Sequence, residues 1–338
     1  MTQIGKKQLP LLFLTLTVLL LFLGLNVGSV PVRVRNIYEL LLNLFNGTGL
    51  RELKSEPIYL ILFNIRLPRM IMALLVGMML SSSGVVVQAV FGNPLADPYL
   101  IGISASAVTG AVLAYWMGLP DLYYGFFAFF ISLGVTFLIF RLSLREGRVN
   151  TTMLLIIGIA LSSFMGAFTS FAMYSIGEDS YRITVWLMGY LGSATWNRVL
   201  LLLPPLVLAV AYFYYYRLDL DALVNGDETA HSLGINTGQL KKRLLVGASL
   251  IAAFSVAFTG MIGFVGLIIP HIIRLIFGNS HKYLIPFAAA GGGIFLLATD
   301  ILARTLLAPV EIPIGVVTAF FGAPFFIFLA LRAKGGRI

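Results

Sequence analysis

Apolar blocks, each about long enough to cross a bilayer, follow one another from residue 9 to residue 331. A helix needs roughly 20 apolar residues to span the hydrocarbon core, where every backbone polar group has to be paired within its own segment. Hydrophobic residues make up 59% of the 338 residues, and Asp, Glu, Lys and Arg only 11%. This hydrophobic fraction is higher, and this charged fraction lower, than in soluble globular domains. Because runs such as 200–211 are apolar throughout, the pattern predicts helices and not the alternating polarity of a membrane barrel.

The blocks predict an all-α polytopic membrane protein with one transmembrane domain over residues 1–338 and about ten transmembrane helices. The expected spans are 9–28, 70–91, 98–117, 122–140, 152–174, 198–216, 243–261, 263–277, 284–304 and 313–331. Lys6 and Lys7 precede a first span that is too long for a cleaved signal. If the amino end is in the cytoplasm, ten spans place the carboxyl end there too. Fourteen of the 23 basic residues are then cytoplasmic, which is a modest positive-inside bias.

Two connections stand out in this topology. Residues 29–69 form the first external loop, which contains helical spacing at 37–45 followed by Gly47, the pattern of a short surface helix. The loop and its exit hold six of the nine external basic residues, which call for an acidic partner: Arg33, Arg35, Arg51, Lys54, Arg66 and Arg69. Residues 217–242 form a cytoplasmic segment between the sixth and seventh spans.

Motifs of catalysis and metal binding are missing from the sequence. It contains no GxxxxGK[ST] phosphate loop, no HExxH and no GxSxG, and its three histidines do not stand at ligand spacing. The chain is therefore expected to be neither an enzyme nor a metal-binding protein, with no catalytic residues and no cofactor of its own. Any energy from ATP has to come from another subunit.

Asp300 is nearly the only ionisable residue deep in a predicted span, and Arg304 follows four residues later on the same helical face. Intramembrane acids often mark proton relays. An i,i+4 pair that neutralises the acid is the favoured interpretation here. A secondary carrier driven by an ion gradient is the weaker transport hypothesis, because such carriers normally have more buried acids.

Residues 225–234 read as a short exposed helix in the cytoplasmic segment. Asn225 is placed to cap it, with Glu228 completing a capping box, and Gly234 is placed to end it. Asp227 and Glu228 favour the positive end of the helix. Since a short helix is marginal in water by itself, this one is expected to dock on a partner, and an ATPase subunit would supply the missing energy.

Six motifs carry a resemblance to a known family. They are RLPR (66–69), SSSGVVVQAVFGNPLADPYLIGIS (81–104), GDETAHSLG (226–234), GFVGLIIPHIIRL (263–275), TDILAR (299–304) and EIPIGVVTAFFGAPFF (311–326). With these motifs the chain resembles the permease subunits of the iron-chelate and cobalamin class of ABC importers, the FecCD family. The resemblance implies a cobalamin-importer-permease-like fold, a homodimer around a central path, and the plasma (inner) membrane of a bacterium or archaeon. It also implies two ATP-binding subunits, which use ATP and Mg²⁺, and an external substrate-binding protein; no nucleic acid is involved.

The resemblance assigns roles to particular residues. Coupling to the ATPase falls on the residues that match the family's coupling helix: Asp227, Glu228, Ala230, Leu233 and Gly234. Docking of the acidic binding protein falls on Arg66, Arg69 and Arg304. The cytoplasmic gate falls on two polar turns, Asn93-Pro94-Leu95 and Asn150-Thr151-Thr152, although Asn, Thr and Pro are also ordinary residues at helix ends.

The translocation path is expected along small, weakly polar side chains. In the fifth span such side chains recur at helical spacing, at Ser162, Gly166, Thr169 and Met173. In the second span the candidates for the path are Ser81, Ser83 and Gln88. Tight helix packing also uses small residues, so path and packing stand as equal alternatives in the fifth span. Arg182 either meets an anionic ligand at the external mouth or pairs with Glu178.

The cargo implied by the family is chelated iron, haem or cobalamin, with molybdate or tungstate as the main alternative. A weakly polar path suits a bulky chelate, because strong contacts would trap a ligand that has to be released. The remaining classes are an ion-gradient carrier and a passive channel or scaffold; an adjacent ATPase gene, and uptake that stops when ATP is exhausted, would distinguish the importer from both.

Overall fold

The computed structural model describes residues 3–28, 32, 35, 57–120, 122–145, 148–149 and 151–334. The expected surface helix at 37–45 and Arg33, Arg51, Lys54 and Asn150 lie outside these residues. The described part is helical except for a short antiparallel hairpin, β1 (Leu144–Arg145) and β2 (Arg148–Val149), in which Leu144 faces Val149.

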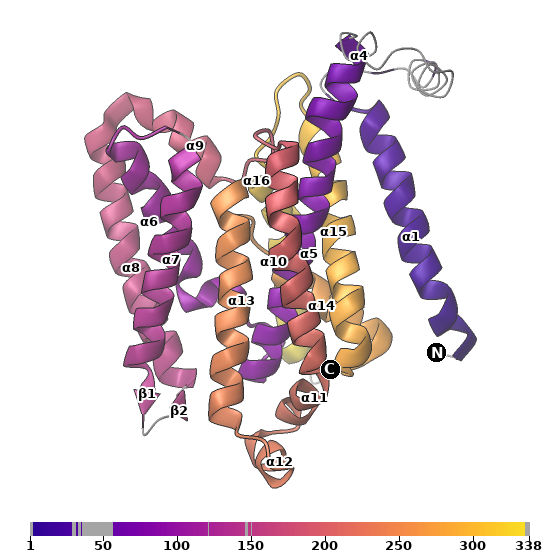
Figure 1. The fold of residues 1–338 in the computed structure, drawn as a ribbon, viewed down its shortest axis with the longest axis vertical. Coiled ribbons are helices and arrows are strands. Elements are labelled where there is room, and N and C mark those ends of the chain that lie inside the picture. Colours follow the sequence, from indigo (N-terminus) through magenta and orange to yellow (C-terminus); the bar gives the residue numbers. More distant parts are fainter. Residues whose placement is uncertain are drawn as a thin grey trace.

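Ten apolar helices make up the body of the described part (Figure 1). They are α1 (Gln3–Asn26), α5 (Leu67–Phe91), α6 (Ile103–Trp116), α7 (Leu122–Leu142), α8 (Thr151–Ile176), α10 (Trp196–Tyr215), α13 (Thr237–Thr259), α14 (Val265–Phe277), α15 (His281–Thr305) and α16 (Ile314–Lys334). Shorter elements connect them: α4 (Pro57–Tyr59), η1 (Leu60–Arg66), η2 (Pro98–Ile101), η3 (Gly177–Ser180), α9 (Tyr181–Leu187), α11 (Arg217–Val224) and α12 (Asp227–Ser232).

Each of the ten expected spans coincides with one of these ten helices, which confirms a multi-pass all-α membrane protein. Seven helices of the described part are long and apolar enough to cross a membrane. The shorter apolar helices are α6, α14 and the first part of α16 (Ile314–Phe328), so a count of ten crossings stays a prediction. The largest difference in boundaries is at α5, because α4, the π-helix η1 and α5 run on without a break from Pro57 to Phe91. Residues 57–69, expected in the external loop, are therefore helical; their place outside the membrane stays a prediction.

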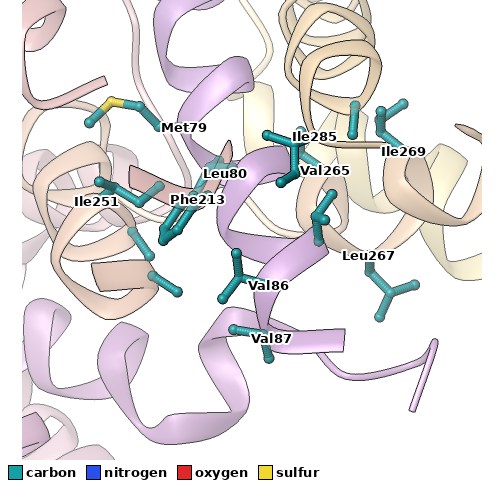
Figure 2. Packing of buried hydrophobic residues seen from close by; sticks show 14 of the residues in the cluster. Met79, Leu80, Val86, Val87, Phe213, Ile251, Val265, Leu267, Ile269 and Ile285 are labelled. Carbon is teal, nitrogen blue, oxygen red and sulfur yellow. The ribbon is translucent and has the colours of Figure 1, made fainter. Parts of the chain in front are cut away.

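Helix α5 lies at the centre of the bundle, because α15, α14, α13 and α10 all pack around it. Pro68 stands where the π-helix η1 passes into α5, and Gly92 ends α5 in the left-handed conformation with φ of 59°. Between these ends nearly every residue is buried. Figure 2 shows Met79, Leu80 and Val86 of α5 among side chains from α10, α13, α14 and α15.

Glycines bring α5 into backbone contact with two neighbours. A Cβ on Gly77 would lie 2.2 Å from the carbonyl oxygen of Gly292 in α15, and a Cβ on Gly84 would lie 1.8 Å from that of Gly266 in α14. No side chain fits at either crossing. Since lipid supplies no hydrophobic force between helices, such close van der Waals contact is what holds a membrane bundle together.

The helices α6, α7 and α8 form a second group, in which α6 packs on both α7 and α8. It has its own small core, with Ala107, Ala111, Tyr124 and Ala172. Helix α7 joins the two groups by packing along α13. Helices α1 and α8 bury few residues of their apolar stretches, so they present wide faces to lipid or to another chain.

We expect Gly84→Ala to lower the thermal unfolding temperature of the purified protein. The new methyl group forces α5 and α14 apart, and overpacking of this kind costs about 1–3 kcal/mol. The matched control is Gly134→Ala in α7, where a Cβ meets no atom within 4 Å and alanine favours the helix. Equal unfolding temperatures for the two variants would contradict the close packing of α5 and α14.

Candidate functional site

Residues 217–242, which the sequence predicts to couple to an ATPase and which we name the coupling segment, project from one end of the bundle, below α13 in Figure 1. Helix α12 begins after Gly226, at φ of 108°, and ends before Gly234, at φ of 80°; both are positions that glycine adopts at little cost. Ala230 points into the subunit and is fully buried, whereas Leu233 is 68% exposed. Asp227 pairs with Lys241 of α13 at 2.6 Å. The helix is thus fixed on its own subunit by one face and leaves Leu233 for a partner.

Two details of the expected helix are wrong. The side-chain Nδ2 of Asn225 donates to the carbonyl oxygen of Asp221 at 2.8 Å and caps no helix, and no side chain caps α12. Instead of a capping box, the burial of Ala230 and the Asp227–Lys241 pair hold the segment. Because Ala230 is buried, its side chain is not available to an ATPase subunit; Glu228 and Gly234 are exposed, as expected of a contact surface.

Helix α11 anchors this segment to the bundle. Its Leu220, Ala222 and Leu223 are buried, and Asp221 accepts hydrogen bonds from the backbone N–H of His281 at 2.8 Å and from its ring Nδ1 at 2.6 Å. Burial raises the pKa of the Asp221 carboxyl, but the hydrogen bonds from His281 outweigh it, so that this pKa lies below its usual value. The first turn of α15 is therefore joined to the coupling segment.

Sequence reasoning missed this pair. Residues 221 and 281 are 60 positions apart, and neither belongs to a recognisable spacing. Glu311, at the other end of the bundle, was missed for the same reason. Only the fold brings these groups to their partners.

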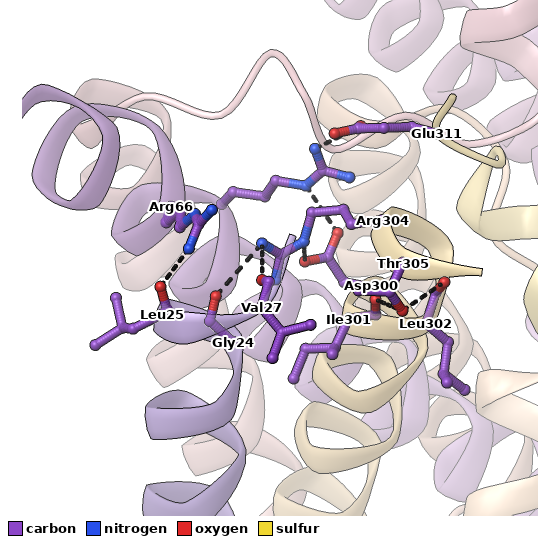
Figure 3. A network of polar contacts seen from close by, with 11 residues as sticks. Gly24, Leu25, Val27, Arg66, Asp300, Ile301, Leu302, Arg304, Thr305 and Glu311 are labelled. Carbon is purple, nitrogen blue, oxygen red and sulfur yellow. Dashed lines mark hydrogen bonds and ion pairs between the residues drawn. The ribbon is translucent and has the colours of Figure 1, made fainter. Parts of the chain in front are cut away.

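An ion-pair network lies at the opposite end of α15 (Figure 3). The carboxylate of Asp300 is 2.8 Å from Arg69 Nε and 3.0 Å from Arg304 Nε, and Arg69 also reaches Glu311 Oε2 at 2.7 Å. Arg66 donates to the carbonyl oxygen of Leu25. Since Arg304 also points to carbonyl oxygens at the end of α1, at 3.5 Å, cations meet the negative end of that helix. The network thus connects α1, α5 and α15.

This geometry confirms the i,i+4 pair of Asp300 and Arg304 and corrects an assumption about docking. Arg66, Arg69 and Arg304 are buried, with exposed fractions of 4%, 7% and 3%, so they are not the surface charges that the sequence analysis assumed. Because these arginines are shielded from water in this conformation, their ion pairs are not the weak, salt-screened contacts that exposed charges make. A docking role for them stays a prediction, and their observed role is to hold helices together.

The turn after α5 contains the first expected gate residues. Asn93 and Pro94 are exposed, and the side chain of Asn93 accepts from the N–H of Leu95 at 2.9 Å. Next, Asp97 accepts from the N–H of Tyr99 at 2.7 Å and begins η2, which packs against α8 and α13. Burial raises the pKa of Asp97 to about 6, although the hydrogen bond from Tyr99 lowers it. Of the second gate turn, Thr152 is exposed at the start of α8.

The path residues expected in the second span are sealed inside the subunit. Ser81, Ser83 and Gln88 are buried. Ser83 donates to the carbonyl oxygen of Ala248, and Gln88 receives a hydrogen bond from Arg274 at 3.0 Å while its amide reaches carbonyl oxygens of α14. In this conformation they serve packing between helices, so the expectation that they line the path is wrong for it.

The remaining path candidates on α8 differ in exposure. Ser162, Thr169 and Met173 are half-buried; the hydroxyl of Thr169 lies 3.0 Å from that of Thr109 in α6, and a Cβ on Gly102 would meet Ser162. Gly166 is exposed. The same broad open face carries Ser163, Ala167 and Ser170, which the sequence analysis did not select. The side chains of Thr151 and Arg182 lie outside the described residues.

A hollow of about 620 Å³ lies beside α16. Its wall includes Met188, Met261, Phe264 and Phe320. Phe264 has φ of 69°, uncommon for a residue with a side chain, and its ring lies so close to Gly322 that no Cβ would fit there. The hollow is almost entirely apolar, and it adjoins the end of α9, the helix that follows α8.

Comparison with known proteins decides the family. The family model of the FecCD transport family matches residues 16–332. This chain belongs to the FecCD transport family. It is 38% identical over 347 residues to a hemin transport system permease protein of Yersinia pestis, covering 98% of this chain and 99% of that protein. A cobalamin import system permease protein of Halobacterium salinarum is 39% identical over 277 residues, covering 81% of this chain and 74% of that protein.

A solved structure agrees with this family. An inward-facing conformation of a metal-chelate type ABC transporter superposes with a TM-score of 0.83 at 30% identity, covering 96% of this chain and 99% of that one. The chain is therefore an ABC transporter permease with several membrane-spanning helices. Its resemblance to this family, first seen in six motifs, is confirmed.

We expect Asp300→Asn to destabilise the permease strongly. Without the carboxylate, Arg69 and Arg304 remain buried beside each other, and removing one partner of a buried pair costs about 3–5 kcal/mol. Glu311→Gln is the matched control, because its side chain is 33% exposed and the change should be mild. An Asp300→Asn permease that is as stable as the wild type but inactive in uptake would instead favour the proton relay.

A second prediction concerns pH. The pKa of Asp97 is raised in the folded state, so the ionised form is disfavoured there, and stability falls as pH rises from about 4, the unfolded pKa, to about 6. Asp97→Asn keeps an oxygen that accepts from Tyr99 and removes the charge. We expect this variant to unfold at a higher temperature than the wild type at pH 7.5, with the gain shrinking toward pH 4. A gain independent of pH would contradict the raised pKa.

Proposed function

We propose that this permease forms the translocation path of an ATP-driven importer for a chelated metal, namely iron-siderophore, haem or cobalamin. The cargo would be delivered by an external binding protein. The observation that carries the proposal is α12, a short helix that is fixed to its own subunit and still exposes Leu233 at 68%. An exposed apolar side chain on a segment that projects from the bundle is available for contact with another protein.

The coupling segment has the connections that such a contact requires. Lys241 ties α12 to the start of α13, and Asp221 ties α11 to the start of α15. A push on α12 would therefore reach two long helices of the bundle directly. Two ATP-binding subunits at this end, which use ATP and Mg²⁺, would supply the push, and this chain would contribute no cofactor.

The topology that fits this arrangement has ten crossings and both termini on the α12 side, which is the cytoplasm. The helices α6 and α14 are short, whereas α16 has 21 residues, and together these three complete the count; a short helix inside a bundle is tolerated because its ends are covered by protein. The network around Asp300 then lies at the external end, where the binding protein would dock.

The path would form between two copies of the chain. Helix α8 leaves much of its surface uncovered, with Ser163, Gly166 and Ser170 among larger apolar side chains. The apolar hollow of about 620 Å³ beside α16 adjoins the helix that follows α8. An apolar hollow suits the organic shell of a chelate better than a hydrated oxyanion, whose charge would be costly to desolvate. Molybdate or tungstate is therefore the second candidate. Mass spectrometry of the ligand that copurifies with the partner binding protein distinguishes the two.

An ion-gradient carrier is the alternative of another class. Among the described residues, Asp300 is the acid that lies deep in a span, and both of its oxygens face arginines. A relay acid has to gain and lose its proton, and two neighbouring cations oppose protonation. This environment supports the importer over the carrier.

We expect Leu233→Asp to uncouple the importer. An apolar anchor in an interface contributes about 2 kcal/mol or more, so the affinity for the ATPase subunits should fall by about tenfold or more, and uptake with it. The control is Leu218→Asp in α11, which is also 68% exposed. Size-exclusion chromatography checks folding, and coprecipitation with the ATPase subunit measures binding. Normal uptake by a folded Leu233→Asp permease would refute the coupling role.

A further inference from the structure

A narrow groove of about 210 Å³ runs between α7 and α13, which lie side by side in Figure 1. Small side chains form its floor, among them Ser132, Ser249 and Ala253, and these are buried. Phe137, which is 67% exposed, and Leu250 form its rims. The two helices touch through small residues, so they leave a channel where larger side chains would fill the gap.

Two basic residues stand at one end of this groove. Arg141 lies in the last turn of α7 and Lys242 near the start of α13, and both line the groove and are exposed. Neither forms an ion pair with an acidic side chain among the described residues. The neighbouring Lys241 differs, since it is bound to Asp227 at 2.6 Å. The end of the groove nearest to α12 therefore holds two positive charges that no acidic side chain of the described residues neutralises.

The length of the groove matches one leaflet of a bilayer. At a rise of 1.5 Å per residue, Lys242 to Ala253 spans about 16 Å and Arg141 to Ser132 about 14 Å, whereas half of a hydrocarbon core is about 15 Å. With the basic residues at the level of the head groups, the groove ends near the middle of the bilayer. Its apolar rims face the acyl region.

We propose that this groove is a binding site for an anionic phospholipid, with one acyl chain between α7 and α13 and the phosphate held by Arg141 and Lys242. Basic pockets between membrane helices at a membrane surface select anionic head groups in this way. The apolar groove alone would accept any acyl chain, and the two cations supply the preference for negative charge. The site consists of this chain's residues alone and does not depend on the proposed transport function.

Native mass spectrometry of the full-length permease tests the proposal, with phosphatidylglycerol and phosphatidylcholine of identical acyl chains offered together. We expect the wild type to retain phosphatidylglycerol preferentially. Arg141→Gln with Lys242→Gln should reduce that preference by about tenfold, because each basic residue near a membrane surface contributes about 1 kcal/mol. The control, Arg217→Gln with Lys282→Gln, removes the same charge from α11 and the start of α15 and should leave the preference unchanged.

A second variant tests the contact with the acyl chain separately from the contact with the head group. Val246→Phe fills the groove from a half-buried lining position and should reduce retention of both lipids while the two cations remain. If it fails to fold, Phe137→Trp narrows the groove from its exposed rim with the same expectation. Thermal unfolding of each variant shows that the comparison is between folded proteins.

Three results would overturn the lipid site. One is an equal effect of the groove pair and the control pair on the phosphatidylglycerol preference. Another is full retention of phosphatidylglycerol by a folded, groove-filled variant, which would mean that no acyl chain enters. The third is loss of ATPase-subunit binding by the Arg141 and Lys242 variant with lipid retention unchanged, which would assign the two cations to a protein contact.

Discussion

The backbone contacts of α5 with α15 and α14 are the constraint on which the rest of this structure depends. Gly77 meets Gly292, and Gly84 meets Gly266, so closely that no Cβ fits between the helices. In lipid, helices attract one another mainly by such van der Waals contact. Because α5 is held on two sides in this way, it becomes the buried axis around which α10 and α13 also pack.

Helix α15 gives the bundle two distinct ends. Its 25 residues extend about 37 Å, with His281 bound to α11 at one end and Asp300 paired with Arg69 and Arg304 at the other. At the first end, α11 and α12 project from the bundle and leave side chains such as Leu233 exposed. At the second, charge is turned inward, where the arginines hold α1 and α5 to α15.

Several features of the candidate site could be predicted from local sequence. The pairing of Asp300 with Arg304 follows from their spacing of four residues on one helix, and the short helix at 227–232 follows from the glycines and acids that flank it. The capping of that helix was predicted wrongly, because the side chain of Asn225 instead donates a hydrogen bond to a carbonyl oxygen in the preceding helix. The burial of Arg66 and Arg69 was also not predictable, since their partners lie up to 242 residues away.

The sequence by itself determined the class of the protein, its apolar helices and the position of the short exposed helix α12. These follow from hydropathy, helix period and helix-ending residues, which act over a few neighbouring positions. Only the tertiary structure decided which faces of those helices are closed. Ser81, Ser83 and Gln88 of α5 and the stripe of α8 look alike as small, weakly polar side chains, yet α5 is covered by four helices and α8 remains largely open. That difference arises from which helices touch, and contact between helices depends on residues far apart in the chain.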